Sequence, residues 1–175
     1  MMTETKTVDC TTERYIAEFR DTERFLAYCR ECDNYGKRHG CPPIDAAVYA
    51  RVGEYERVRI IGMKIVPDRS GLPLSAAHSL MEPVVQDMNR KLLQLEKELG
   101  GFACGFVGQC PYCGDAPCAR RQGLPCRHPE WVRPSLEALG FDVEKTAAVL
   151  LEWEMRWGHD GMLPPWLLLV CGVFF

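Results

Sequence analysis

Two compact groups of cysteines constrain this chain more than any other feature of its sequence. The first group is Cys29, Cys32 and Cys41, and the second is Cys110, Cys113, Cys118 and Cys126. Each group begins with a C-x2-C pair, which can bring two thiolates to one metal within a single turn of chain. Thiolates are soft ligands that select zinc, iron–sulfur clusters or Cu(I). The sequence therefore predicts a metal-binding protein.

Length and charge narrow the class of protein further. A chain of 175 residues predicts one domain with a core large enough to fold without disulfides. The formal net charge is −3 and the pI is about 5.8, so no nucleic-acid footprint is visible. Residues 1–11 read as a flexible N-terminus, and residues 12–175 as a single metal-binding domain.

The compartment follows from the absence of targeting signals and from the use of cysteine. The first residues carry no apolar signal segment. The longest apolar stretch, Leu163 to Phe175, is 13 residues long and contains two prolines, whereas a membrane span needs roughly 20. We expect no membrane association and a cytoplasmic location, where thiols stay reduced and clustered cysteines indicate metal more often than disulfides.

Hydrophobic periodicity gives a coarse secondary structure. Spacings of three and four predict helices from Thr12 to about Tyr28, from Leu74 to Leu99, and from Asp142 to Trp157, with a short one over Ser135–Leu139. Apolar and β-branched runs predict strands at Tyr55–Val66, Phe102–Val107 and Trp166–Phe175. A strand, a helix and a strand in this order suit a right-handed βαβ crossover. The expected fold class is α/β or α+β: a small mixed sheet with packed helices and Cys-rich metal-binding loops at one end.

The second cysteine group has enough ligands for a complete site. Four thiolates at spacings of 2, 4 and 7 suffice for a 4Fe–4S cluster or for structural zinc. Zinc ribbons use two C-x2-C pairs, whereas here the third and fourth ligands come singly, which favours the cluster. Arg127 and its neighbouring arginines could offset the cluster's negative charge, hold an anionic substrate, or form a solvated basic face.

The first cysteine group is one ligand short. Three cysteines on a second 4Fe–4S cluster leave one iron open to a substrate, and an open iron is a Lewis acid. The alternatives are a zinc site completed by His39, Cys10 or Cys104, or a single centre shared by both groups. His39, Arg127, His128 and Glu137 are the candidates for residues that support the metal ligands without being ligands themselves.

Several motifs in order resemble a known family. They are the segment Cys29–Lys37, then Cys41-Pro42-Pro43, the Cys110/Cys113 pair, Pro125–Glu130, Arg133–Ala138 and Gly140–Val143. Together they are similar to small bacterial and archaeal proteins described as predicted metal-binding proteins of unknown function, over roughly residues 25–172. The resemblance implies metal binding. The family is met mostly in anaerobes, which favours iron–sulfur clusters over zinc. Two departures from the family pattern are His39, where an aromatic is expected, and the longer gap between Cys113 and Cys118.

These observations lead to one main hypothesis and two alternatives. The chain is expected to be an iron–sulfur protein of anaerobic metabolism that transfers electrons or acts on a small substrate. One alternative is a zinc-stabilised binding module without redox activity, and the other is a metal carrier or sensor with exposed, exchangeable cysteines. A redox partner protein or a small anionic substrate would be the partner. The sequence does not decide whether a reaction is catalysed, or whether a second subunit in a homodimer covers the C-terminal apolar strand.

Overall fold

The computed structural model describes residues 1–106, 110–114 and 116–175. The strands are β1 (Met2–Thr11), β2 (Arg57–Val66), β3 (Phe102–Cys104) and β4 (Leu167–Phe174). The α-helices are α1 (Thr12–Phe19), α2 (Thr22–Arg30), α3 (Ala46–Arg51), α4 (Ala77–Leu99) and α5 (Val143–Leu150). Four short 3-10 helices are η1 (Val52–Glu54), η2 (Leu74–Ala76), η3 (Ala119–Gln122) and η4 (Glu137–Leu139). The mixed α/β class expected from the sequence is confirmed.

The four strands form one sheet in the order β1-β2-β4-β3, and each neighbouring pair is antiparallel. Because β2 and β3 are both antiparallel to β4, they run parallel to each other with α4 as their crossover. The expected βαβ connection is therefore present, but it is split, since β4 lies between its two strands. For this reason the sheet has only antiparallel neighbours, where the sequence suggested a mixed sheet.

The N-terminal residues differ from the expectation. The prediction of a flexible segment over residues 1–11 was wrong, because Met2–Thr11 pairs with β2 along its whole length, from Met2 opposite Val66 to Thr11 opposite Arg57. Four of the ten residues in this segment are Thr, and it carries no apolar run. It forms a half-exposed edge strand that is held by the backbone ladder and by the ion pair between Asp9 and Arg59, at 2.7 Å.

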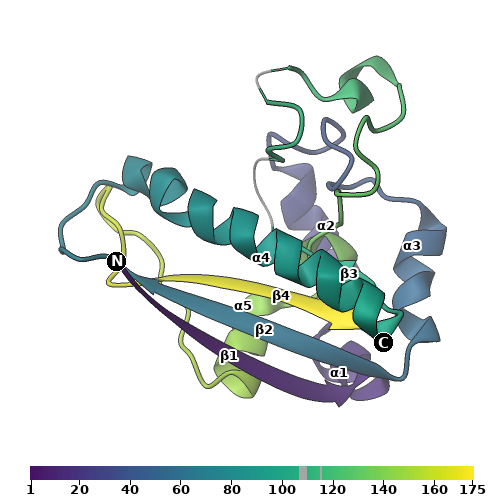
Figure 1. Cartoon of the computed structure of the whole chain (residues 1–175), viewed down its shortest axis with the longest axis horizontal. Coiled ribbons are helices and arrows are strands. Elements are labelled where there is room, and N and C mark those ends of the chain that lie inside the picture. The colour runs from purple at the N-terminus through teal and green to yellow at the C-terminus, as the bar shows by residue number, and fades with distance from the viewer. Residues whose placement is uncertain (107–109, 115) are drawn as a thin grey trace.

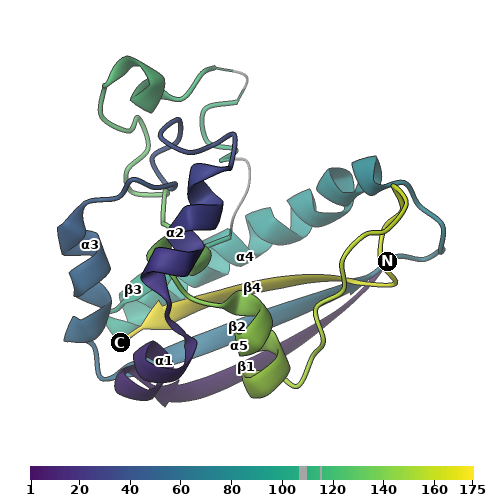
Figure 2. The ribbon, with the colours of Figure 1, turned by 180° about the vertical axis from the view of Figure 1, so that it is seen from behind.

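Helices cover both faces of the sheet, as the two opposite views show (Figures 1 and 2). Successive side chains of a strand point to opposite faces, so β2 supplies both cores. Val58 and Ile60 belong to the core that includes α1 and α5 residues, whereas Ile61 and Met63 pack with Met88 of α4. The apolar stripe that predicted α4 thus packs on one face of the sheet, and α1 and α5 pack on the other.

Helix α5 is shorter than its periodicity predicted. It begins after Asp142, whose carboxylate caps the helix by accepting a hydrogen bond from the backbone N–H of Lys145 at 2.8 Å. It ends at Leu150 instead of Trp157. Leu151 and Trp153 are both buried while Glu152 between them has φ of 54°. Packing of these alternate side chains into the core requires irregular backbone in place of another helical turn.

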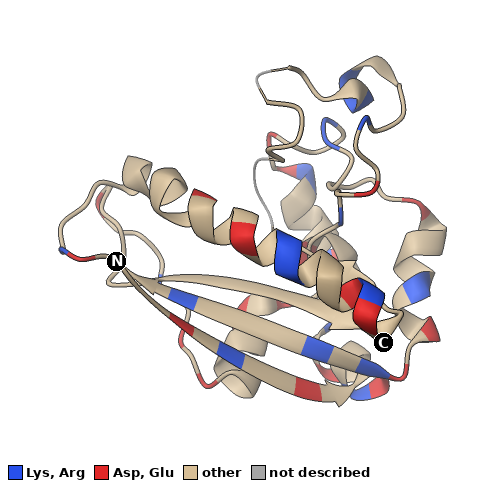
Figure 3. Ribbon diagram, viewed as in Figure 1, with Lys and Arg blue, Asp and Glu red and all other residues tan. Residues whose placement is uncertain are grey.

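The two cysteine-bearing segments lie side by side at one end of the molecule, beyond the edge of the sheet (Figures 1 and 2). The first segment follows α2, and the second runs between β3 and η4. Lys and Arg occur on both segments (Figure 3). The fold therefore places Cys-rich loops at one end, as the sequence predicted.

Candidate metal centre

The first cysteine group (Cys29, Cys32 and Cys41) is built from a helix end and a chain of tight turns. Asp21 caps the start of α2, and Cys29 lies in the last turn of that helix. The backbone N–H of Cys32 donates to the carbonyl of Cys29 at 3.1 Å, which brings the pair into one turn. The N–H of Gly36 then donates to the carbonyl of Pro42 at 2.8 Å and closes the loop that returns Cys41 to the pair.

The second cysteine group (Cys110, Cys113, Cys118 and Cys126) lies in a segment with little regular structure. Cys118 immediately precedes the 3-10 helix η3, and its carbonyl accepts a hydrogen bond from Arg121 N–H at 3.0 Å. The Sγ atom of Cys126 accepts a hydrogen bond from the backbone N–H of His128 at 3.4 Å. Backbone donors to sulfur tune thiolate-ligated metal centres, so this contact is suited to a metal ligand.

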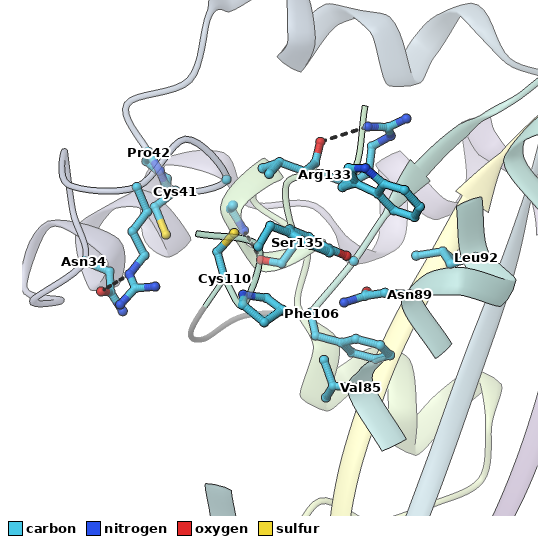
Figure 4. A pocket seen from close by; sticks show the side chains of 18 of the residues that line it. Asn34, Cys41, Pro42, Val85, Asn89, Leu92, Phe106, Cys110, Arg133 and Ser135 are labelled. Carbon is cyan, nitrogen blue, oxygen red and sulfur yellow. Dashed lines mark hydrogen bonds between the residues drawn. The ribbon is translucent and has the colours of Figure 1, made fainter. Parts of the chain in front are cut away.

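Each cysteine group lines a pocket of its own, and Cys110 lines both. The small pocket, with a volume of about 20 Å³, is lined by all four cysteines of the second group and by His39 and His128. The large pocket, of about 140 Å³, is lined by the three cysteines of the first group and by Cys110. Figure 4 shows Cys41 and Cys110 on two segments that face each other across this pocket. The two groups are therefore adjacent.

The thiols of each group also influence one another electrostatically. Burial raises the pKa of Cys29, and the neighbouring Cys32 and Cys41 raise it further. Burial likewise raises the pKa of Cys110, and the other three cysteines of its own group add to that rise. Gathering thiolates without a cation is unfavourable, and a bound metal ion reverses that preference because it compensates their charge. The thiol arrangement fits a cationic metal group at each place.

The thiols are gathered but do not form a finished coordination shell. Among residues 1–106, 110–114 and 116–175, no cluster of three or more His, Cys, Asp or Glu side chains is close enough to hold a metal ion as it stands. All ten cysteines are free thiols, so none of the candidate ligands is consumed by a disulfide. Ligand chemistry, exposure and grouping therefore suit a metal, and binding would draw the sulfurs together.

Arg120 joins the two cysteine segments. Its guanidinium Nη1 donates to the carbonyls of Arg38 at 2.7 Å and Cys41 at 2.6 Å, and its Nη2 donates to the carbonyl of Pro43. All three carbonyls belong to the loop of the first group. For the basic residues of the second segment, the sequence allows charge compensation, substrate binding or a solvated face. For Arg120 the contacts are structural, because it connects one cysteine loop to the other.

His39 makes a second connection between the segments. Its Nε2 lies 3.0 Å from the carbonyl oxygen of Leu124, so Nε2 carries the proton and donates. In the neutral ring this leaves Nδ1 as the nitrogen with a free lone pair. Metal-binding histidines are commonly oriented in this way, with one nitrogen donating to a carbonyl and the other free for the metal. His39 lines the small pocket, beside the second group rather than the first.

Arg133 anchors the end of the second segment to α4. Its guanidinium forms an ion pair with Glu96 at 2.6 Å, and both side chains are largely buried. Burial is the largest single influence and raises the pKa of Glu96, but the hydrogen bonds from Arg133 and from the Ala103 N–H, together with the charges of Arg133 and Arg51, outweigh it and leave that pKa lowered. Glu96 also accepts from Ala103 N–H of β3 at 2.8 Å, so one carboxylate holds a helix, a strand and the cysteine segment together.

Among the described residues, Glu137 lines neither of the two pockets. It begins η4, which packs against α2, the helix that carries Cys29. Its Oε2 is buried and has no hydrogen-bond partner in the part of the chain that is described. Burial raises the pKa of this carboxyl to about 7. Its supporting role toward the metal ligands stays a prediction.

Arg127, the other charged candidate, donates from Nη1 to the carbonyl of Pro117 at 3.0 Å and shapes the second loop.

The remaining cysteines belong to the sheet. Cys10, Cys104 and Cys171 lie in β1, β3 and β4, and each is buried. Burial raises the pKa of Cys104 and of Cys171 far above the usual range for thiols. None of the three lines either pocket in the described structure, so they are placed as packing residues.

The pocket residues contributed by α4 were missed from the sequence. Val85, Asn89 and Leu92 lie along one side of the large pocket (Figure 4). Asn89 is the sequence feature from which this pocket wall could have been predicted. It lies four residues after Val85 and three before Leu92, so it places an amide on an otherwise apolar helix stripe. A polar residue at such a position indicates either a buried hydrogen bond or a binding site.

Comparison with known proteins supplies the family. A family described as "Predicted metal-binding protein (DUF2284)" matches residues 16–170. The chain therefore belongs to this family, and the resemblance seen in its motifs is confirmed. No curated protein and no solved structure matches the chain. Among the helices of the described ranges, none has the length and apolar character needed to cross a bilayer.

Proposed function

Starting from membership of a metal-binding family, we propose that this chain is an iron–sulfur protein with two neighbouring clusters. Cys110, Cys113, Cys118 and Cys126 would hold one 4Fe–4S cluster, and Cys29, Cys32 and Cys41 would hold a second one with an open iron. The observation that carries the proposal is the adjacency of the two groups, since Cys110 lines the pockets of both.

The two sites would divide the chemistry between them. When bound, a fully ligated cluster supplies electron transfer and an open iron supplies a Lewis acid for a small substrate. The residues of the chain would keep the sites together: Arg120 holds the loop of Cys41 against the second segment, and the Arg133–Glu96 pair fixes that segment to α4. In anaerobic metabolism such a protein would exchange electrons with a partner protein or act on a small substrate.

One observation favours zinc as a second candidate for the complete cysteine set. The small pocket has a volume of about 20 Å³, which is room for a single ion-sized body and less than a cluster requires. A tetrahedral zinc site with four thiolate ligands would draw the four sulfurs together around one ion. In that case the chain would be a zinc-stabilised binding module, and the first group would be the place for any chemistry.

Metal and sulfide analysis of protein purified without oxygen separates these candidates. Two clusters predict about eight iron and eight sulfide per chain, with absorbance near 400 nm that falls on reduction. Zinc without sulfide would overturn the iron–sulfur proposal. About four iron and four sulfide together with one zinc would mean that one group holds a cluster and the other a structural ion, contrary to two clusters.

A further inference from the structure

The large pocket has the features of a binding site for a small aromatic molecule. We propose that it binds a neutral aromatic of about the size of phenol, which carries one hydrogen-bonding group, and presents it to the metal at Cys29, Cys32 and Cys41. The inference deepens the proposed function and rests on it for the metal, because it names the class of substrate that the open iron would meet.

Size sets the first limit on the ligand. The pocket volume is about 140 Å³. An apolar protein cavity of roughly 150 Å³ is known to bind benzene, so a single six-membered ring with one small substituent is the largest ligand that this pocket admits. The pocket opens to solvent at a mouth formed by exposed residues, since Cys32 is exposed and Trp131 is 44% exposed. A small molecule can therefore enter without unfolding of the loops.

The lining indicates an aromatic body. Tyr112 and Trp131 lie side by side in the wall, with ring centroids 6.0 Å apart, and Phe106 lines the side next to α4. Val85, Leu92 and Leu93 complete the apolar surface. Aromatic rings that pack on other rings in offset or edge-on geometry gain about 0.5–1.5 kcal/mol beyond simple burial. The four aromatic side chains of the lining, with Tyr35 as the fourth, therefore favour a ring over an aliphatic chain of equal size.

The charges of the pocket indicate a neutral ligand. Of the two lining arginines, Arg133 pairs with Glu96 at 2.6 Å, whereas Arg38 donates from Nε to Asn34 at 2.7 Å and its charge acts on the Cys41 thiol, where it partly opposes the rise that burial causes in the pKa of Cys41. No Asp or Glu is among the described residues that line the pocket. Among the described residues, the lining thus offers no carboxylate for a cation, and the positive charge of Arg38 is directed at the thiols of the first group.

Asn89 supplies the polar contact. Its side chain extends from α4 into the pocket, toward the side on which Cys110 lies (Figure 4). It lies near the Tyr112 hydroxyl and partly opposes the rise that burial causes in the pKa of Tyr112. An amide has two donor hydrogens and a carbonyl oxygen, so Asn89 has the capacity to bond a ligand hydroxyl or carbonyl. Asn34 and Ser135 also line the pocket, and a few polar groups amid apolar walls are the usual composition of a specific small-molecule site.

Fluorine NMR of two probes tests the proposal on the anaerobically purified protein. We use 4-fluorophenol, which has the hydroxyl, and fluorobenzene, which lacks it. Both are expected to bind. Val85→Phe fills the pocket and should weaken both probes at least about tenfold, whereas the matched surface change Val149→Phe, at an exposed position of α5, should leave both unchanged. Asn89→Leu should weaken only 4-fluorophenol, by about threefold to tenfold.

The outcomes separate this inference from the proposed function, because iron and sulfide are measured on the same samples. Failure of both probes to bind, or binding that Val85→Phe does not reduce, would overturn the pocket assignment even in protein with full clusters. Equal loss of both probes in Asn89→Leu would overturn the hydrogen-bonding role. Probe binding in protein that contains no iron would sustain the pocket and contradict the clusters. In the reduced protein, broadening of the bound 4-fluorophenol signal that Cys41→Ala removes would show that the ligand lies beside the metal.

Discussion

At the scale of single residues, Arg120 is the side chain on which the arrangement of the two cysteine groups depends most. A charged donor bonded to three carbonyls of another loop restricts that loop more than any one backbone hydrogen bond does. The next residue, Arg121, is exposed and forms no side-chain hydrogen bond or ion pair among the described residues. Substitutions of Arg120 and Arg121 therefore compare an arginine that connects two loops with a neighbouring arginine that is solvated.

We expect Arg120→Ala to loosen the contact between the cysteine loops and to speed metal loss. Hydrogen bonds to charged groups contribute about 1.5–3 kcal/mol each and are not additive, so a loss of about 2 kcal/mol in the stability of the metal-bound form is expected. The rate of metal release to a chelator measures it. Arg121→Ala serves as the control and should release metal at the rate of the unaltered protein. Equal rates for the two variants would show that Arg120 does not hold the loops.

Glu137 provides a prediction about pH. Burial raises the pKa of its carboxyl from the ordinary 4.5 to about 7, so between these values the folded protein keeps a proton that the unfolded chain has released. The stabilisation linked to this proton is complete below pH 4.5 and is lost as pH rises toward 7. For the metal-free, reduced protein, this contribution to the free energy of unfolding should fall by about 2–3 kcal/mol between pH 5 and pH 8.

Glu137→Gln removes the titrating group while keeping its shape. The free energy of unfolding of the variant is compared with that of the unaltered protein by urea unfolding at pH 5 and at pH 8. This difference should shift in favour of the variant by about 2–3 kcal/mol between pH 5 and pH 8. Glu130→Gln, at an exposed position, should show no such change. A difference between Glu137→Gln and the unaltered protein that stays constant with pH would contradict the burial of an unpaired carboxyl.

At the scale of elements, the contact between η4 and α2 sets the position of Cys29. Gly140 follows η4 with φ of 88°, and a Cβ atom there would lie 2.6 Å from Cα of Thr22, at the start of α2. Only glycine allows this close approach with this backbone conformation. The helix that carries Cys29 is therefore seated against the segment that follows the second cysteine group.

Gly140→Ala should destabilise the protein through both conformation and contact. The left-handed conformation costs an alanine about 1–2 kcal/mol, and the overlap with the backbone of Thr22 adds about 1–3 kcal/mol. Gly100→Ala is the control for conformation alone, because Gly100 has φ of 62° and no atom within 4 Å of its Cβ position. Urea unfolding should give Gly140→Ala the larger loss. Equal losses for the two variants would mean that the η4–α2 contact adds nothing.

The elements also show how far the sequence alone leads. Periodicity predicted β2, α4 and β4 well, because their apolar residues pack directly on the cores. It missed β1, whose polar edge strand is defined by pairing with β2, and it overextended α5, whose pattern continues into irregular chain at Leu151. The cysteine groups could be named from spacing alone. The large pocket could not, because its walls come from α2, α4 and the second segment, which only the folded chain brings together.

At the scale of the whole molecule, the fold separates the packed sheet and its helices from the end that carries the two cysteine groups. The sheet carries helices on both faces, and the cysteine segments lie beyond it and are tied to it by the Arg133–Glu96 pair (Figure 1). An arrangement with metal-binding loops on a packed scaffold allows the sites to be held in fixed relation to the large pocket. It also implies that losing one metal site should leave the sheet and the other site intact.

The central claim is that the two cysteine groups form two separate metal sites, and metal content of single-group variants tests it most directly. Cys41→Ala disrupts the first group, Cys118→Ala disrupts the second, and Cys10→Ala alters a buried cysteine outside both. We predict that each of the first two variants keeps about half of the metal bound by the unaltered protein when the sites hold equal clusters, and that Cys10→Ala keeps all of it. Complete loss of metal from either Cys41→Ala or Cys118→Ala alone, in a chain that remains folded, would contradict two sites and indicate one shared centre.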